Sequence, residues 1–346
     1  AAGRSLGEMA ARAITVATVL GVVAVAGAAT VDALRGDTQR HEVTSRPVRT
    51  EAAPREATPD ELAAARISGV LLYSDPSDCA LRAVRLPALE PAEAPTSGIP
   101  GTCAFSASLD GNAVFPNGSA WRPDGNLVAV PAGGGVDVLA PGTSWGRHFP
   151  NAAAPAFRPD DSLTFVRRTR LVAWSRCHPN RAAVVFREPR PVRRCPHVVT
   201  SEERLTAGLH RLAVPPGGRV AVQELVWLGP SAFAAVVTAR RFGTVDALVV
   251  VRGGRVLGPL VATEDVSGLS VSPGGRFFAV LSRGSLLVFA RDGRNLFDAT
   301  ARSAAWSPDG RRLAVSDGRF VSFRRLPSGR PAARPIRLAA RDIAWR

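Results

Sequence analysis

Residues 305–315 read Ala305-Trp306-Ser307-Pro308-Asp309-Gly310-Arg311-Arg312-Leu313-Ala314-Val315, which is an aromatic residue, a turn and an apolar strand. Pro308 sets φ for the first central position of a turn, and Asp309 tolerates the second and can bond the backbone. Gly310 accepts the left-handed conformation that a tight hairpin with a bulge needs. The stretch therefore predicts two antiparallel strands joined by a tight turn, with Trp306 packed between neighbouring sheets.

The same pattern recurs along the chain at 120–125, 156–161 and 270–275, and in degenerate form at 226–230. The positions that define the repeat are Trp121, Pro123, Asp124, Gly125, Phe157, Pro159, Asp160, Pro273, Gly275, Trp306, Pro308, Asp309 and Gly310. Trp121 and Phe157 are 36 residues apart, and Val271 and Trp306 are 35 residues apart. A period of this size predicts one supersecondary unit per repeat.

Each unit is rich in short strands, and four strands per unit make a blade of a β-propeller. We therefore predict an all-β fold, a six-bladed β-propeller over residues 67–346. The predicted blades cover 67–116 with 342–346, then 117–151, 154–199, 219–265, 266–300 and 301–341. The 70 residues between Phe157 and Trp227 leave an alternative open, in which 213–222 belongs to a seventh, degenerate blade.

The turn Trp306–Gly310 with the strand that follows it resembles the PD40 repeat of TolB-like, WD40-like β-propellers. The resemblance covers about residues 67–346, and Arg122–Gly125 also fits it well. It implies the propeller fold and little about function, because propellers serve many unrelated roles.

The two ends of the repeat region predict how the ring closes. No turn motif precedes the strand Gly69–Tyr73, whereas Asp342–Arg346 matches the start of a blade and then stops. Trp345 holds the position of Trp121 and Trp306. We expect Asp342–Arg346 to pair beside Gly69–Tyr73 and so remove two open sheet edges.

The N-terminal region predicts export. Ala13–Val31 is a run of 19 residues without a charge, about the length that spans a bilayer. We therefore divide the chain into a membrane anchor or signal segment (1–35), a linker with a short helix (36–66) and the propeller (67–346). Ala24-Val25-Ala26 also fits a signal-peptidase site, so a secreted protein is the alternative to a single-pass membrane protein with the propeller outside the cytoplasm.

Four cysteines form two local pairs, Cys79 with Cys103 and Cys177 with Cys195. An even number in an exported chain predicts two disulfides. Adjacent Cys and His at 177–178 also invite a zinc site, but ligands for one metal usually stand two to four residues apart. We predict no metal and no cofactor.

All 44 basic residues are arginine, and the formal net charge is +15. Eleven of these arginines fall between Arg302 and Arg346, where only three aspartates occur. An excess of this kind attracts an anionic partner, although a genome rich in G and C would also produce it. The candidate surface comprises Arg324, Arg325, Arg330, Arg334 and Arg337. No nucleic acid is expected, because the strands lack interleaved surface aromatics for stacking bases.

Gly142-Thr143-Ser144-Trp145-Gly146 matches the nucleophile elbow of hydrolases. That motif needs a strand-to-helix turn, whereas Arg147-His148-Phe149-Pro150 predicts a loop between two strands of a blade. We therefore expect no enzymatic activity.

The sequence as a whole indicates a membrane-tethered, extracytoplasmic binding or scaffold module for a protein or an anionic cell-envelope component. A propeller-type lyase or hydrolase and the sensor domain of a membrane signalling protein are the alternatives.

Overall fold

The computed structural model describes residues 55–95, 103–107, 113–122, 125–167, 170–176, 194–201, 219–240, 244–253 and 255–346. The expected N-terminal segment Ala13–Val31 lies outside these residues. No helix within them is both long and apolar enough to cross a membrane. Pro54–Arg346 forms one compact unit.

Within the described residues, this unit is all-β apart from the short helix α2 (Pro59–Ala64). Thr58 caps α2: its Oγ1 accepts a hydrogen bond from the Glu61 amide at 3.3 Å, and the Glu61 carboxylate accepts one from the Thr58 amide at 3.3 Å. This capping box, with Pro59 in the first turn, begins the short helix that the sequence predicted within 36–66.

The described strands form six four-stranded antiparallel sheets and one two-stranded sheet. The first sheet is β26 (Asp342–Trp345), β1 (Gly69–Ser74), β2 (Leu81–Leu86) and β3 (Glu90–Ala92). The second is β6 (Ala120–Trp121), β7 (Val128–Ala132), β8 (Gly135–Leu139) and β9 (Gly146–Pro150). The third is β10 (Ala152–Phe157), β11 (Leu163–Arg167), β12 (Arg170–Arg176) and β13 (Arg194–Ser201).

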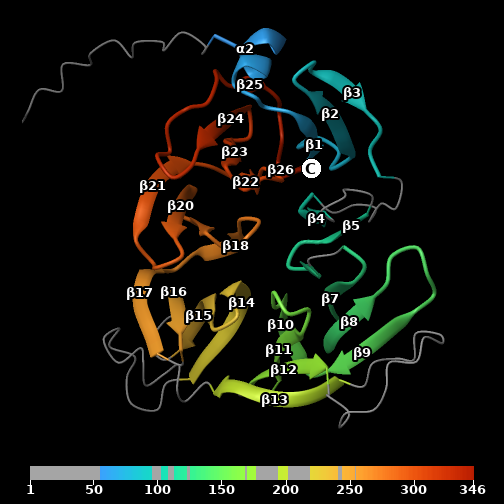
Figure 1. Cartoon of the computed structure of the whole chain (residues 1–346), viewed down its shortest axis with the longest axis vertical. Helices are drawn as coiled ribbons and strands as arrows, with labels where there is room; N and C mark the ends of the chain where they lie inside the picture. The colour runs from blue at the N-terminus through green and yellow to red at the C-terminus, as the bar shows by residue number, and fades with distance from the viewer. Residues whose placement is uncertain are drawn as a thin grey trace, which may run out of the picture. The chain divides into compact units, whose positions relative to one another are not determined.

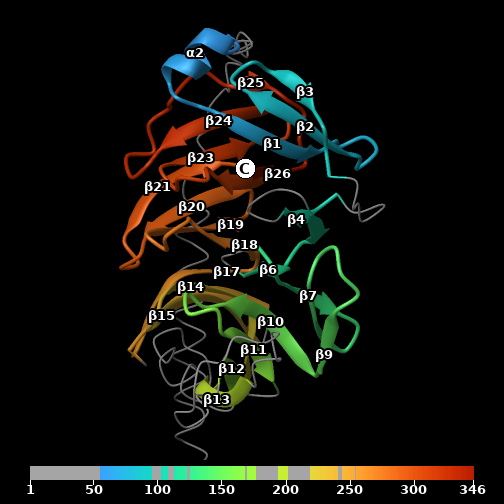
Figure 2. The ribbon, with the colours of Figure 1, turned by 45° about the vertical axis from the view of Figure 1, so that its right-hand side comes forward.

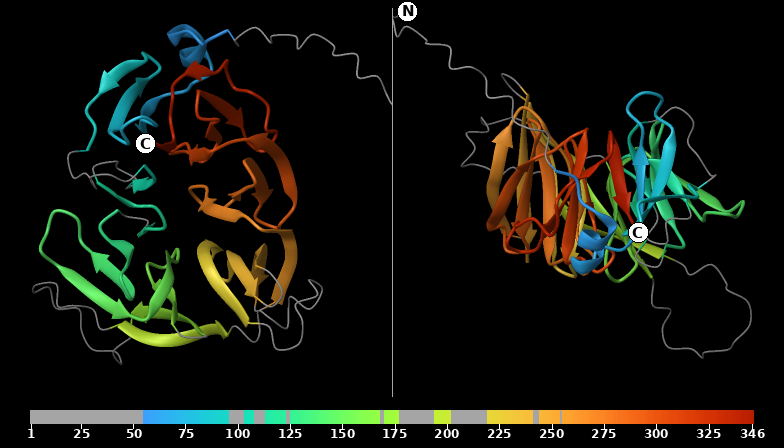
Figure 3. Two further views of the ribbon diagram at one scale, coloured as in Figure 1. Left: turned by 180° about the vertical axis from the view of Figure 1, so that it is seen from behind. Right: turned by 90° about the horizontal axis from the view of Figure 1, so that it is seen from above.

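The fourth sheet is β14 (Arg219–Gly229), β15 (Ala232–Arg240), β16 (Thr244–Arg252) and β17 (Arg255–Thr263). The fifth is β18 (Val266–Val271), β19 (Phe277–Ser282), β20 (Ser285–Ala290) and β21 (Asn295–Thr300). The sixth is β22 (Ser303–Trp306), β23 (Arg312–Ser316), β24 (Phe320–Arg325) and β25 (Ile336–Arg337). The two-stranded sheet is β4 (Phe105–Ala107) with β5 (Val114–Pro116). In Pro54–Arg346 the sheets follow one another in chain order around a β-propeller (Figures 1 and 3).

One feature of this strand order contradicts the predicted first blade, and a second decides against the proposed seventh blade. The sequence placed 67–116 in one blade, but β4 and β5 leave it and form a sheet of their own between the first and second four-stranded sheets. Val220–Val222, part of the proposed seventh repeat, belongs to the long first strand of the fourth sheet.

The repeated turn has the geometry that its sequence predicted. In each copy, the amide of the fourth turn residue donates a hydrogen bond to the carbonyl of the first. The three pairs are Gly310 to Ser307 (2.8 Å), Gly275 to Ser272 (2.9 Å) and Asp161 to Arg158 (3.0 Å). Gly310 and Gly275 have φ of +65° and +67°. Pro123 and Asp124 of the second-sheet copy lie outside the described residues. We call the end of each sheet that carries this turn the motif end.

The core consists of clusters that lie between consecutive sheets. Sheets three and four, for example, share a cluster containing Val166 and Trp227, and sheets four and five share one containing Leu228 and Phe278. Further clusters join sheets two and three, five and six, six and one, and the first sheet with β4–β5. Burial between faces of neighbouring sheets is what holds a propeller together.

In three of the sheets, the tryptophan before the turn bonds a residue of the preceding sheet. Trp306 Nε1 donates to Ser270 Oγ at 3.0 Å, and Trp227 Nε1 donates to Thr164 Oγ1 at 2.8 Å. Trp121 Nε1 donates to Ser106 Oγ of β4 at 3.2 Å. Trp121 of the second sheet therefore bonds the two-stranded sheet in the way that Trp306 and Trp227 bond the preceding four-stranded sheet.

The predicted closure is confirmed. β26 pairs antiparallel with β1, with Leu71 opposite Trp345 and Tyr73 opposite Ile343 (Figure 2). Trp345 Nε1 donates to the Ser68 carbonyl at 3.0 Å, and the indole ring packs edge-on against Phe323 at 5.3 Å between ring centres. The last strand of the chain thus completes its first sheet.

The junction around Asp342 joins four strands. Its carboxylate accepts hydrogen bonds from the Phe105 amide of β4 (2.9 Å) and from Ser303 Oγ of β22, and its amide donates to Ser74 Oγ of β1 at 3.0 Å. Burial raises the pKa of this carboxyl, although the hydrogen bonds from Ser303, Phe105 and Ile343 act in the opposite direction. The first, sixth and two-stranded sheets therefore meet at one half-buried carboxylate.

The predicted disulfide between Cys79 and Cys103 is present, with a Cα–Cα distance of 4.5 Å. It connects the β1–β2 turn to the segment just before β4. Cys177 lies outside the described residues, so the pairing of Cys177 with Cys195 stays a prediction.

Candidate anion-binding site

A cavity of about 370 Å³ opens at the motif end of the sixth sheet, beside the end of α2. Its lining residues are Ala64, Ala65, Arg66, Arg311, Arg312, Arg325 and Leu326. Three segments bring the four arginines together: Arg66 follows α2, Arg311 and Arg312 follow the motif turn, and Arg325 ends β24. Arg312 and Arg325 are direct partners in the β23–β24 register.

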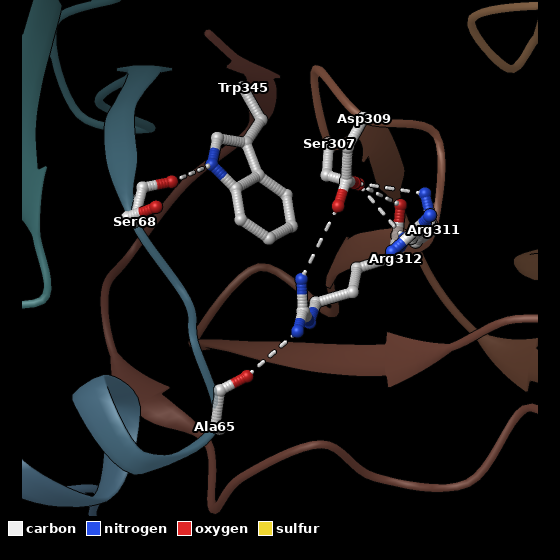
Figure 4. Close-up of polar contacts among 7 residues, drawn as sticks. All are labelled: Ala65, Ser68, Ser307, Asp309, Arg311, Arg312 and Trp345. Carbon is white, nitrogen blue, oxygen red and sulfur yellow. Dashed lines mark hydrogen bonds and ion pairs between the residues drawn. The ribbon is translucent and has the colours of Figure 1, made fainter.

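Arg312 is the fixed member of the group (Figure 4). Its Nη2 donates to the Ala65 carbonyl at 2.9 Å, and its Nη1 lies 3.6 Å from Asp309 Oδ2. The motif turn and the end of α2 thus hold one guanidinium between them. Arg66, Arg311 and Arg325 are exposed.

Asp309 is committed to the turn. Its Oδ1 accepts hydrogen bonds from Ser307 Oγ (2.6 Å) and from the Arg311 amide (3.0 Å). Burial alone would raise the pKa of this carboxyl, but those hydrogen bonds and the charges of Arg312 and Arg311 together hold it below its ordinary value. Asp309 therefore stays ionised and neutralises part of the charge of Arg312.

A second cavity, of about 330 Å³, adjoins the first and shares Ala64, Ala65 and Arg325 with it. Glu61 and Arg334 lie on its wall and form an ion pair, with Arg334 Nη1 3.2 Å from Glu61 Oε1. The second cavity therefore has a paired charge on its wall, whereas the first is surrounded by guanidinium groups.

The chemistry of the first cavity favours a compact anion. Guanidinium groups are cationic at neutral pH and bind phosphate, sulfate or carboxylate through two parallel hydrogen bonds. None of its described lining residues carries a carboxylate, an imidazole or a nucleophilic group. Elsewhere in the described part of the chain, no three His, Cys, Asp or Glu side chains form a group that could hold a metal ion.

The five arginines singled out from the sequence lie in different surroundings. Arg325 lines both cavities and Arg334 lines the second. Arg324 Nη1 bonds the Gly329 carbonyl at 3.4 Å, within its own turn. Arg330 and Arg337 are exposed. Sequence reasoning missed Arg66, Arg311 and Arg312, although the two arginines directly after the motif turn were a visible signal.

The hydrolase-like motif lies in the turn between two strands of a sheet, as the sequence predicted, but Arg147–Pro150, which was predicted as a loop, belongs to the strand β9. Gly142–Trp145 connects β8 to β9, the third and fourth strands of the second sheet, and no helix follows. His148 Nδ1 lies 2.7 Å from Asp137 Oδ1 across these strands, and both side chains are partly exposed. The described residues show no hydrogen bond from Ser144 to this pair.

No protein-family model and no curated protein sequence matches the chain. Solved structures of β-propeller proteins do match it. Hsv2 from Kluyveromyces lactis has 15% identity and a TM-score of 0.30, over 60% of this chain and 72% of that one. The calcium-binding protein regucalcin from Agrobacterium tumefaciens has 12% identity and a TM-score of 0.39, over 62% of this chain and 72% of that one. At this similarity, the propeller fold rests on the chain's own sheets and registers.

Proposed function

We propose that the chain is a six-bladed β-propeller, related to the TolB-like proteins, that binds an anionic partner outside the cytoplasm while an N-terminal segment tethers it to the membrane. One observation carries the binding role: Arg66, Arg311, Arg312 and Arg325 line a cavity with no carboxylate among its described lining residues. Its volume falls in the range of small-ligand sites, about 300–1,000 Å³.

The Cys79–Cys103 disulfide supports placement outside the cytoplasm, because disulfides persist in oxidising compartments. The apolar run Ala13–Val31 supports a tether. The choice of a binding module over a hydrolase or lyase is supported by the lining of the cavity, whose described residues offer cations but no acid–base pair.

Binding of pyrophosphate to the full chain in detergent tests this function. Replacement of Arg311 and Arg325 by alanine is expected to raise the Kd measured by titration calorimetry by more than about tenfold, because each charge-assisted hydrogen bond contributes about 1.5–3 kcal/mol. Both side chains are exposed, so the melting temperature should stay within about 2 °C of the parent.

Arg319→Ala is the matched control, because Arg319 is an exposed arginine of the same sheet at the end opposite the motif turn. Its Kd should match that of the parent. An equal loss of binding in this control, or a parent chain that does not bind pyrophosphate, would remove the proposed site.

A further inference from the structure

Arginines gather at the motif end well beyond the cavity. In an antiparallel four-stranded sheet, the turns between strands one and two and between strands three and four lie at the same end. In the sheets spanning 219–337, these turns and the residues next to them carry only two acidic residues among those described, Asp292 and Asp309. Their arginines are Arg252, Arg255, Arg276, Arg291, Arg294, Arg311, Arg312, Arg325, Arg330 and Arg334.

Contacts between neighbouring turns make these sheet ends one continuous surface. Arg252 Nη2 donates to the Arg291 carbonyl at 3.3 Å, across the fourth and fifth sheets. A Cβ added to Gly310 would lie 2.8 Å from the Pro273 carbonyl, so the motif turns of the fifth and sixth sheets are in direct contact. Except for the half-buried Arg312, the ten arginines are exposed.

The opposite end of the same sheets has a different balance. Its described turn and connection residues include three carboxylates, Glu264, Asp265 and Asp317. The arginines in these turns and connections or next to them, among the described residues, are Arg219, Arg240, Arg283, Arg302, Arg319, Arg337 and Arg341. Arginine is therefore frequent at both ends, but its excess over carboxylate is larger at the motif end, and a genome-wide preference for arginine does not explain that difference.

We propose that the motif end of the fourth to sixth sheets docks on the surface of an anionic lipid bilayer. The arginines are spread over the ends of three neighbouring sheets, which suits an extended layer of phosphate groups better than one small ligand. Basic residues near an anionic leaflet are each attracted to it over about a Debye length.

The attachment point of the chain favours a bilayer as the partner. Ala65 and Arg66, which follow α2, line the cavity at the motif end, so the polypeptide enters the propeller at that end. This part of the inference rests on the proposed tether. A spacer at 36–57 would then join a membrane segment to the same end that carries the surplus of arginines.

Amide hydrogen exchange of the full chain, reconstituted into phosphatidylcholine vesicles with or without one-quarter phosphatidylglycerol, tests the docking. We expect peptides covering 272–276 and 291–294 to exchange about fivefold more slowly on the anionic vesicles. Arg276→Ser with Arg294→Ser should abolish this difference. Arg283→Ser with Arg302→Ser removes two exposed arginines at the opposite end of the same sheet and should preserve it.

The proposal would be overturned if exchange were slower on both kinds of vesicle or on neither. It would also be overturned if the Arg276 and Arg294 double variant kept the same protection on anionic vesicles as the parent. Protection by soluble poly(glycerol phosphate) without protection by anionic vesicles would overturn it as well, because that result would assign the surface to a polymer. Retention on neutral vesicles reports the tether separately. A chain that neutral vesicles do not retain would contradict the tether, while exchange on anionic vesicles would still decide the docking.

Discussion

Removal of Asp342–Arg346 is expected to unfold or aggregate the protein at temperatures where the full chain is stable. The deletion takes away the innermost strand of the first sheet and exposes the edge of β1, whose Leu71 and Leu72 are fully buried. It also removes Trp345, which is 8% exposed, and Ile343, which is 4% exposed. Loss of a core tryptophan alone costs about 3–5 kcal/mol, a large part of the 5–15 kcal/mol that stabilises a typical protein.

The buried polar groups at the junction add to this cost. Without Asp342, the Phe105 amide and the Ser303 hydroxyl lose their acceptor, and an unsatisfied buried donor costs about 1–3 kcal/mol. Size-exclusion chromatography and thermal unfolding check the result. A frayed C-terminal tail, the usual fate of chain ends, would instead give a truncated protein with an unchanged melting temperature.

Trp345→Ala separates the side chain from the strand. It should destabilise the fold by about 3–5 kcal/mol while leaving the β1–β26 pairing in place. Trp145→Ala is the matched control, because Trp145 is 49% exposed. Its unfolding free energy should stay within about 0.5 kcal/mol of the parent.

Gly275→Ala is expected to destabilise the propeller by about 3 kcal/mol. A left-handed alanine costs about 1–2 kcal/mol, and overpacking typically costs a further 1–3 kcal/mol. Gly275 has φ of +67°, and a Cβ there would lie 2.6 Å from the backbone oxygen of Leu228 in the preceding sheet. Backbone cannot move aside as a flexible side chain can, so the fourth and fifth sheets would have to separate.

Gly125→Ala isolates the strain of the turn from the clash between sheets. Gly125 has φ of +75° at the same place in its motif, but a Cβ there would meet nothing within 4 Å. Urea unfolding should therefore show a smaller loss for Gly125→Ala, about 1–2 kcal/mol. Equal losses in the two variants would mean that neighbouring motif turns do not touch.

The elements with local signals could be predicted from the sequence. The motif turn sets its own φ angles, and Trp345 stands in register with Trp121 and Trp306, which was enough to predict the closing strand. The second role of the turn glycines was not visible. Gly275 and Gly310 also lie against the backbone of the preceding sheet, and that contact exists only after the sheets assemble.

The two-stranded sheet could not be predicted, because its strands carry no local sequence signal. β4 and β5 are three residues each and no motif turn joins them, so pattern alone assigned them to the first blade. Their place is set by long-range contacts, in which the Phe105 amide bonds Asp342 and Ser106 accepts a hydrogen bond from Trp121.

The candidate site was predicted only in part. The arginine surplus near the C-terminus pointed to the sixth sheet, and Arg325 and Arg334 do line cavities there. Arg66 joins Arg311 and Arg312 only because closure brings the start of the repeat region against its end. The number of arginines in one stretch of sequence does not show that Arg66 will lie beside Arg311 and Arg312.

Cross-linking across the closing strands tests the closed propeller most directly. Val70 and Arg346 exchange two backbone hydrogen bonds, at 2.8 and 3.0 Å, so Tyr73 and Ile343 form a non-hydrogen-bonded pair three positions along. Cα atoms in such pairs lie about 4.5 Å apart, within reach of a disulfide. Tyr73→Cys with Ile343→Cys should therefore yield a linked 73–343 peptide in the non-reduced digest. Tyr73→Cys with Ala344→Cys should not, because the neighbouring residue faces the other side of the sheet. Free thiols at 73 and 343, or equal linkage in both double variants, would contradict the closed ring.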